Sequence, residues 1–173
     1  MTHDKHKQQL RDAAEKLALV LAQGGMQKTA ARVSTALLFS QQETMTSAEL
    51  CEELQISAGA VSAAVRQLAP LGLLERVPVP GSRRDHYRFP NGAWGQLMTQ
   101  QTQLLATMSA FARKGLVAAG GPDSTVGRRL HEMEDFYGFM HRGVRPLIDR
   151  WNAEFTANRE TGRSLKVHAS TPE

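Results

Sequence analysis

Hydrophobic residues recur at helical spacing along most of the chain, and glycine and proline residues divide this pattern into segments. In the first segment Leu10, Ala14 and Leu17 share one helical face, and Gly24 and Gly25 end the run. The whole pattern predicts six helices, over about residues 4–23, 27–39, 46–54, 58–68, 92–117 and 124–158.

Two short stretches between the fourth and fifth helices have the character of β-strands. They cover about residues 74–78 and 86–89 and flank a polar turn at residues 79–85. The sequence therefore predicts a mainly α protein with a small β-hairpin. A polar tail, residues 159–173, shows no periodicity and is predicted to be disordered.

Residues 46–89 follow the order of a winged helix-turn-helix: a capped helix, a tight turn, a second helix and a two-stranded wing. Thr46 and Glu49 have the spacing of a capping box, and Ser57 is placed to cap the second helix. In such folds the second helix enters the major groove of DNA. We expect this domain to span residues 26–91.

Composition narrows the class of protein without deciding its function. Apolar residues make up 41% of the chain, the net charge is +4, and Cys51 is the single cysteine. One cysteine excludes an internal disulfide and fits a reducing cytoplasm. Since the N-terminus lacks an apolar signal core and no apolar run is long enough to span a membrane, we expect a cytoplasmic protein. The mild positive charge allows a nucleic-acid partner but does not require one.

Candidate DNA contacts lie on the face of the second helix that is opposite its apolar side. Small residues near the helix N-terminus let the backbone approach the groove closely. Arg66 can bridge two acceptors of a guanine, and Gln67 can read an adenine. Alternatively, Arg66 binds only phosphate, or this face is simply solvated. The candidates here are Ser57, Ala58, Gly59, Ser62, Ala63, Arg66 and Gln67.

The predicted wing concentrates positive charge at its tip. Arg83 and Arg84 are placed to reach a minor groove or flanking phosphates, although two arginines in a turn are often only solvated. Asp85 can hold one arginine in a salt bridge. Weaker candidates for phosphate contact are Lys28, Arg32 and Thr46.

The same block resembles the MarR family, the multiple-antibiotic-resistance regulators, from about residue 18 to residue 94. The resemblance is carried by residues 47–50, 57–62, 67–76 and 81–88. The family's wing usually reads Asp-x-Arg, whereas residues 81–85 here read Gly-Ser-Arg-Arg-Asp. The double arginine with a following tyrosine resembles an actinobacterial branch, related to choline-responsive repressors, that includes efflux-pump regulators.

The two C-terminal helices carry long apolar stripes that a small winged helix cannot cover. In the last helix the stripe has a period of 3.5 residues, and consists of Leu130, Met133, Tyr137, Met140, Val144, Leu147 and Trp151. We expect residues 1–25 and 92–158 to pair two copies into a homodimer on a pseudo-palindromic operator. The alternative is a bundle within one chain. Pro146 predicts a kink in the last helix.

The resemblance further implies a repressor that releases double-stranded DNA when a small apolar effector binds near the dimer helices. Methionine and aromatic side chains suit such a pocket, although stripes of this kind are more often plain core. The candidate ligand-binding residues are Phe89, Trp94, Met98, Met108, Phe111, Phe136, Phe139 and Met140.

Three classes of function remain open from the sequence. The first is a sequence-specific DNA-binding regulator, for instance of a transporter or efflux gene. The second is a winged-helix protein-interaction module that does not read DNA. The third is a small enzyme or ligand carrier, although no catalytic motif, metal-ligand spacing or cofactor loop stands out. We therefore expect no enzyme activity, no metal and no cofactor.

Overall fold

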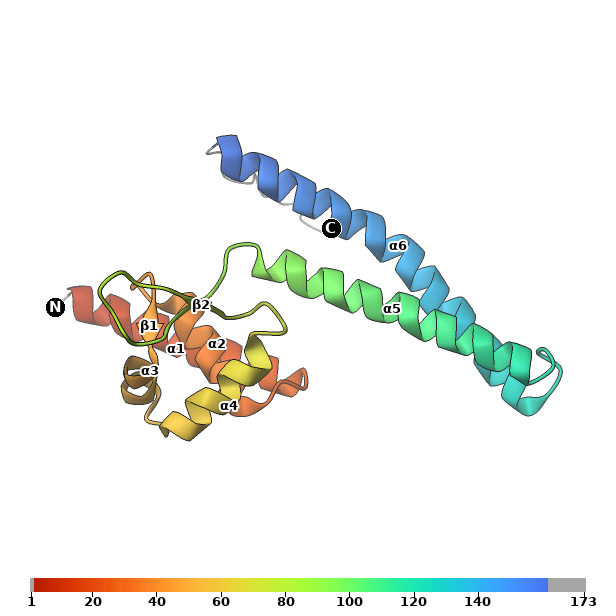
Figure 1. Cartoon of the computed structure of the whole chain (residues 1–173), viewed down its shortest axis with the longest axis horizontal. Coiled ribbons are helices and arrows are strands. Elements are labelled where there is room, and N and C mark those ends of the chain that lie inside the picture. The colour runs from red at the N-terminus through yellow and green to blue at the C-terminus, as the bar shows by residue number, and fades with distance from the viewer. Residues whose placement is uncertain (1, 162–173) are drawn as a thin grey trace. The chain divides into compact units, whose positions relative to one another are not determined.

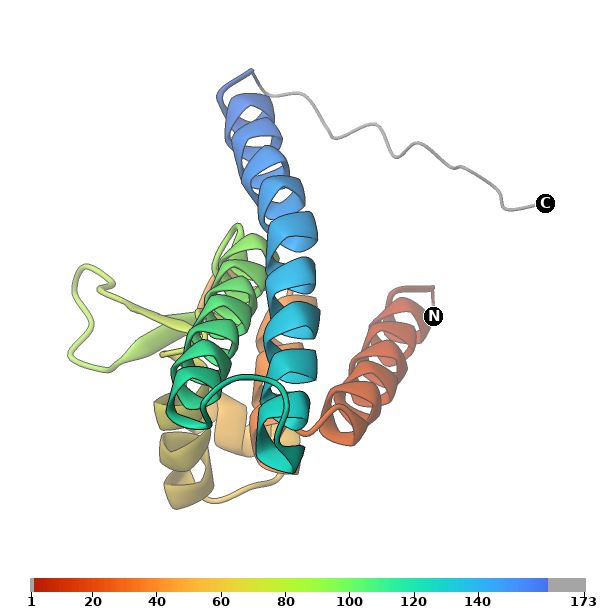
Figure 2. The same ribbon diagram turned by 90° about the vertical axis from the view of Figure 1, so that its right-hand side faces the viewer.

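The computed structural model describes residues 2–161. The chain divides into two compact units, Met1–Ala93 and Trp94–Glu173, and each is considered by itself (Figures 1 and 2). Within the described residues, no helix is long and apolar enough to cross a membrane.

The first unit contains four helices and three short strands. The helices are α1 (Thr2–Gln23), α2 (Lys28–Phe39), α3 (Ser47–Leu54) and α4 (Ala58–Leu68), and the strands are β1 (Met45–Thr46), β2 (Glu75–Val77) and β3 (His86–Arg88). Helix α2 packs against α1, α3 and α4. The largest fully buried side chains of the described residues belong to this unit, and include Leu50, Leu68, Leu73, Leu74, Val33 and Val61.

Local chemistry explains where α3 and α4 begin. The Thr46 hydroxyl accepts from the Glu49 backbone N–H at 3.3 Å, while the Glu49 carboxylate accepts from the Thr46 backbone N–H at 2.6 Å. This is the predicted capping box. The Ser57 hydroxyl caps α4 by accepting from the Ala60 N–H at 3.2 Å. Between the two helices Gln55 adopts a left-handed conformation, with φ of 53°.

The sheet has three strands rather than the two that the sequence predicted. All pairings are antiparallel, in the order β1-β3-β2, and Thr46 lies opposite His86. The prediction missed β1 because a strand of two residues is too short to show any alternation. This extra pairing anchors the inner strand of the hairpin, β3, to the start of α3.

The second unit is an antiparallel pair of long helices, α5 (Ala93–Ala118) and α6 (Thr125–Thr161). Small residues let the two helices approach each other closely. A methyl group at position 115 would lie 2.9 Å from Leu130 Cδ1, so the Leu130 side chain would have to shift to admit it. Between the helices, the Asn152 side-chain amide donates to Thr99 Oγ1 at 3.2 Å, and Arg113 pairs with Glu134 at 2.7 Å.

Helix α6 is longer than the sequence indicated. It is one helix through Pro146 and ends at Thr161, so the predicted boundary of the tail at residue 159 was wrong by a few residues. The sequence carried a signal for this end, because Gly162 follows Thr161 directly and glycine is common just after a helix C-terminus. The rest of the predicted tail, residues 162–173, lies outside the described residues. The kink at Pro146 stays a prediction.

Candidate nucleic-acid interface

The exposed face of α4 brings together the residues that the sequence nominated. Val61, Ala64 and Leu68 are buried on the opposite side and fix which face points outward. Six of the seven candidates are exposed and Ala63 is half-buried; the exposed six are Ser57, Ala58, Gly59, Ser62, Arg66 and Gln67. The face is therefore a continuous surface of small and polar side chains that ends in a cation.

No close contact inside the chain requires a glycine at position 59. A methyl group there would meet only Ser57 Oγ, at 3.9 Å, which is ordinary contact. Glycine inside a helix costs about 1 kcal/mol relative to alanine. The structure therefore offers no intramolecular benefit to offset that cost. A close approach by a partner surface is a physical reason for glycine at this position.

The hairpin between β2 and β3 forms a compact polar tip. The Ser82 N–H donates to the Val79 carbonyl at 3.0 Å, and the Arg84 N–H donates to Ser82 Oγ at 3.1 Å. Gly81 has a φ of 80°, in the region that favours glycine. Both Arg83 and Arg84 are exposed at this tip.

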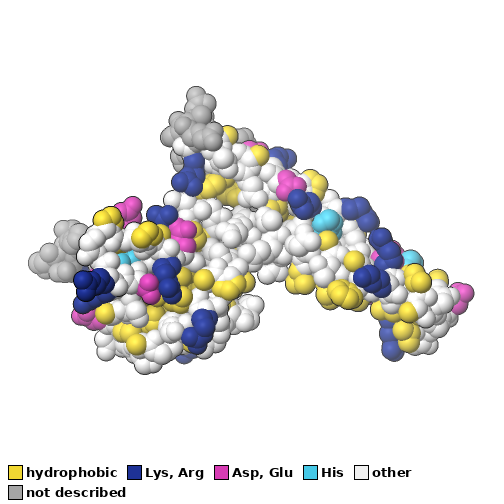
Figure 3. Space-filling view, viewed as in Figure 1, with side chains coloured by type: hydrophobic (Ala, Val, Ile, Leu, Met, Phe, Trp, Pro, Cys, Tyr) yellow, Lys and Arg dark blue, Asp and Glu magenta, His cyan; other side chains and the backbone are white. Residues whose placement is uncertain are grey.

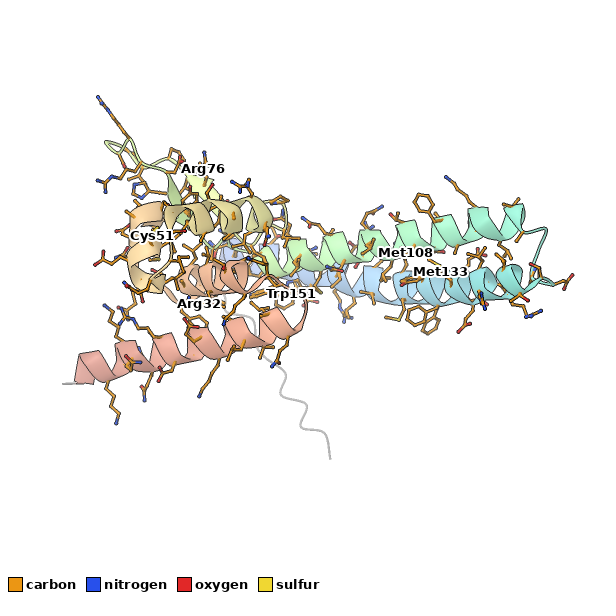
Figure 4. All side chains as sticks on the ribbon, turned by 90° about the horizontal axis from the view of Figure 1, so that it is seen from below. Arg32, Cys51, Arg76, Met108, Met133 and Trp151 are labelled. Atoms are coloured by element: carbon orange, nitrogen blue, oxygen red, sulfur yellow. The ribbon has the colours of Figure 1, made fainter. Side chains whose placement is uncertain are left out.

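Ion pairs separate the arginines of this region into two groups. Asp85 pairs with Arg76 at 3.5 Å, so it holds an arginine at the base of the wing and not one at the tip. The Arg76 guanidinium also lies 5.9 Å from the centroid of the Tyr87 ring (Figure 4). Arg88 pairs with Glu75. Among the described residues, no acidic side chain forms an ion pair with Arg66, Arg83 or Arg84. These three cations are therefore left to a partner.

The pKa of the Glu49 carboxyl lies below its ordinary value. The main causes are the hydrogen bonds that it accepts from the Thr46 backbone N–H and from the Thr46 hydroxyl. Electrostatic interactions with His86 and Arg84 contribute less. Glu49 is thus a firmly ionised carboxylate within electrostatic reach of one tip arginine.

The weaker phosphate candidates fare differently. The Thr46 side chain is buried and its hydroxyl is engaged in the capping box, so its exposure does not support the nomination as a DNA contact, which stays a prediction. Arg32 is held by Glu15 of α1 through two nitrogens, at 3.0 and 2.9 Å, which satisfies its charge within the chain (Figure 4). Lys28 is exposed at the first position of α2 and stays a candidate.

Comparisons with known proteins identify the family of this chain. A model of the MarR family matches residues 29–85, which run from α2 to the wing. A second model, described as MmpR5-like MarR family transcriptional regulator, matches residues 92–154. The HTH-type transcriptional regulator MmpR5 of Mycobacterium tuberculosis is 30% identical over 125 residues, which cover 72% of this chain and 76% of that protein. The chain belongs to the MarR family.

A solved structure agrees with this assignment to the MarR family. It is described as a transcriptional regulator, is 27% identical, and superposes with a TM-score of 0.73. The match covers 84% of this chain and 99% of that chain. The protein is therefore a transcriptional regulator and not an enzyme, which sets aside the third class of function. Regulators of the MarR family bind DNA and act as dimers.

The residues nominated for an effector pocket in this MarR-family chain do not enclose one by themselves. Phe111, Phe136 and Phe139 are 65%, 57% and 69% exposed, so they lie on the surface of the α5–α6 pair. Met108 and Met140 are half-buried there, and Trp94 and Met98 are about 40% exposed. Phe89 is half-buried in the first unit. The pocket was expected near the dimer helices, so the exposure of these side chains in a single chain leaves it a prediction.

Part of the predicted dimer stripe of this MarR-family chain is occupied within the α5–α6 pair. Leu130 lies against Gly115, and Met133, labelled on α6 in Figure 4, is half-buried. Leu147 and Trp151 remain 53% and 40% exposed. The stripe is therefore divided between packing inside the pair and the free surface.

Sequence reasoning missed two features of the first unit. One is a cavity of about 210 Å³ between α1 and α2, whose apolar wall includes Leu10, Phe39 and Met45. The other is His86, whose ring nitrogens lie within hydrogen-bond distance of the Thr44 hydroxyl before β1 and of the Ser82 hydroxyl in the hairpin turn. Its contact with Thr44, 42 residues earlier in the chain, could not be found from the sequence.

Proposed function

We propose that this MarR-family regulator is a homodimer that binds double-stranded DNA sequence-specifically through α4 and the β2–β3 wing. The observation that carries the proposal is the division of charge at this surface. Arg66, Arg83 and Arg84 have no acidic partner among the described residues, whereas Arg76 and Arg88 beside them are paired. A cation kept free at an exposed tip is available to a phosphate or a base.

Within this proposal α4 lies in the major groove. Its N-terminal residues Ser57, Ala58 and Gly59 are small enough for the helix to approach a phosphate or the groove floor. Arg66, at the end of the same face, reads a base, and the neighbouring Gln67 contributes a second polar contact. Arg83 and Arg84 contact the adjacent minor groove or its phosphates. Lys28 adds a further backbone contact.

The second unit supplies the surface for the second copy. Because α5 and α6 meet through small residues, many of their bulky apolar side chains point outward, and hydrophobic side chains are visible along the pair in Figure 3. The exposed apolar side chains are Trp94, Met98, Leu104, Phe111, Val117, Val126, Phe136, Phe139, Leu147 and Trp151. A surface of this kind is typical of an interface. Two-fold pairing places the α4 helices about 34 Å apart, on two halves of a pseudo-palindromic site.

The regulatory part of the proposal rests on the family. We propose a cytoplasmic repressor of a transporter or efflux gene, released by a small apolar molecule. Exposed side chains of the second unit are available to line a cavity in the dimer. The candidates for this role are Trp94, Met98, Met108, Phe111, Phe136 and Met140, with Phe89 of the first unit.

Selection of bound genomic fragments by the purified protein, followed by titration of the selected duplex at several salt concentrations, tests the DNA-binding part. We expect tight binding to a two-fold-related sequence. The log-log salt slope should be roughly −0.9 per neutralised phosphate. A chain that selects no fragment and binds duplexes with a flat salt dependence overturns the proposal. That result favours a protein-interaction module.

A further inference from the structure

His86 connects three segments of the chain at the base of the wing. Its Nδ1 lies 3.2 Å from Thr44 Oγ1, in the loop before β1, and its Nε2 lies 2.9 Å from Ser82 Oγ, in the hairpin turn. Ser82 Oγ also accepts the backbone N–H of Arg84 at 3.1 Å. One imidazole thereby links the body of the domain to Ser82, whose hydroxyl in turn holds the backbone of Arg84.

These hydrogen bonds can form whichever ring nitrogen of His86 carries the proton. A neutral imidazole donates from one nitrogen and accepts at the other, and the hydroxyls of Thr44 and Ser82 can each donate or accept. An imidazolium donates from both nitrogens, and both hydroxyls can then accept. Both hydrogen bonds can therefore form in each protonation state of the ring, so the contact can be a permanent part of the structure.

The hairpin depends on such a bridge because its strands are short. Strands β2 and β3 pair only through residues 75–77 and 86–88, so residues 78–85 extend beyond the sheet. A loose turn loses conformational freedom when it binds, and that loss weakens the complex. A bridge that already orders Ser82 and Arg84 in the free protein reduces the loss.

Arg84 also has a potential competing partner inside the domain. Glu49, Glu52, Arg84 and His86 line one hollow between α3 and the wing. Glu49 is ionised there, and Arg84 is close enough to influence it. A turn that relaxes toward α3 brings the Arg84 guanidinium nearer to this carboxylate. An ion pair between them would withdraw the cation from DNA.

We infer that His86 is a positioning residue of the wing: by bridging Thr44 and Ser82 it holds the turn that presents Arg83 and Arg84 to DNA. The inference rests on the proposed function, since it assigns the tip arginines to DNA contact. His86 itself makes no contact with DNA in this account. Its contribution passes through the backbone of residues 82–84.

Variants of His86 test the inference on the full chain. His86→Ala removes both contacts and should weaken binding to the selected duplex about two- to tenfold, the range for losing a hydrogen bond. The matched control is His131→Ala, which removes an exposed histidine from α6. The same loss in both variants, or none in His86→Ala, overturns the inference.

Conservative variants separate the two halves of the bridge. In His86→Gln the side-chain amide reaches the position of Nε2 and can keep the Ser82 contact, whereas in His86→Asn it reaches the position of Nδ1 and can keep the Thr44 contact. Because His86 holds the turn through its contact with Ser82, we expect His86→Gln to bind more tightly than His86→Asn, relative to His86→Ala. Equal loss in both variants contradicts a role through Ser82.

A double-mutant cycle distinguishes positioning from a general loss of stability. If His86 acts through the tip, His86→Ala should cost nothing further once Arg83 and Arg84 are both alanine. Additive losses overturn the inference. Ser82→Ala, at an exposed position, provides a variant that is expected to fold normally and should reproduce the effect of His86→Ala.

Hydrogen exchange measures the bridge without DNA. The backbone N–H of Arg84 should exchange faster in His86→Ala than in the unaltered chain, while the amides of α4 keep their rates. Unchanged exchange at Arg84 overturns the inference. If the unaltered chain binds no duplex at all, the proposed function fails. If it binds and His86→Ala binds equally well, only the role of His86 fails.

Discussion

The Arg66 guanidinium donates a hydrogen bond to Ser62 Oγ across one turn of α4, at 2.9 Å. Both side chains are exposed, so the contact orients the cation along the helix face instead of burying it. An arginine held in this way has lost part of its rotamer freedom before it meets DNA. Ser62 is therefore a support for Arg66 in addition to a candidate DNA contact.

Arg66→Ala should weaken binding to the preferred duplex by about 1–3 kcal/mol and relax the preference at one base pair. The reason is that a bidentate contact to a base is lost, while the phosphate contacts of the wing remain. Competition binding with duplexes altered at single positions measures both effects. Ser62→Ala is the companion variant and should give a smaller loss with the same base preference. Equal losses on every duplex would show that Arg66 contacts only the backbone.

Arg84→Ala should lower affinity by a similar factor on all duplexes and reduce the log-log salt slope by about 1. A backbone contact releases counterions but carries no base information. Titrations across salt concentrations measure the slope. Arg145→Ala makes the same change of charge in α6, where Asp149 already pairs with the arginine at 2.8 Å, and serves as the control. An unchanged slope in Arg84→Ala would remove this residue from the interface.

The helices and their order could be predicted because each is marked by local chemistry. The capping box of Thr46 and Glu49 and the cap at Ser57 are present as the sequence indicated. Strand β1 could not be found, because two residues carry no periodicity and its pairing with β3 depends on distant segments. For the same reason the role of His86 was invisible, since Thr44 lies far from it in sequence.

The exposure of the candidate site residues could be predicted where a residue's face is set by its own helix. The exposed face of α4 follows from the spacing of Val61, Ala64 and Leu68. Predictions that depended on tertiary pairing did worse. Nothing near Arg32 in sequence shows that Glu15 holds it, and nothing near Phe136 shows which face of α6 meets α5. Ion pairing and helix packing across elements decide such cases.

Thr46→Ala should destabilise the first unit by about 1 kcal/mol, because it removes an N-cap and one donor to Glu49. The folded-state pKa of Glu49 is lowered, so its contribution to stability is present above its unfolded pKa. That contribution is lost as the pH falls through the folded pKa. Glu49→Gln should therefore reduce the acid dependence of the unfolding free energy, which denaturant titrations at several pH values measure. Glu52→Gln, on the same helix, is the control, and identical pH dependence in the two variants would contradict the assignment.

Phe111→Glu should prevent self-association, because it places a charge in the middle of the exposed apolar surface of α5. The Phe111 side chain is 65% exposed in the single chain, so the change should leave the fold of the α5–α6 pair intact. Burying a carboxylate in an apolar dimer interface is costly even with Lys114 nearby, and the monomer is then favoured. Sedimentation velocity measures the mass, and circular dichroism checks the helices. Gln103→Glu adds the same charge at an exposed polar position of α5 and should remain dimeric. A Phe111→Glu chain that still sediments as a dimer would place the interface on another face.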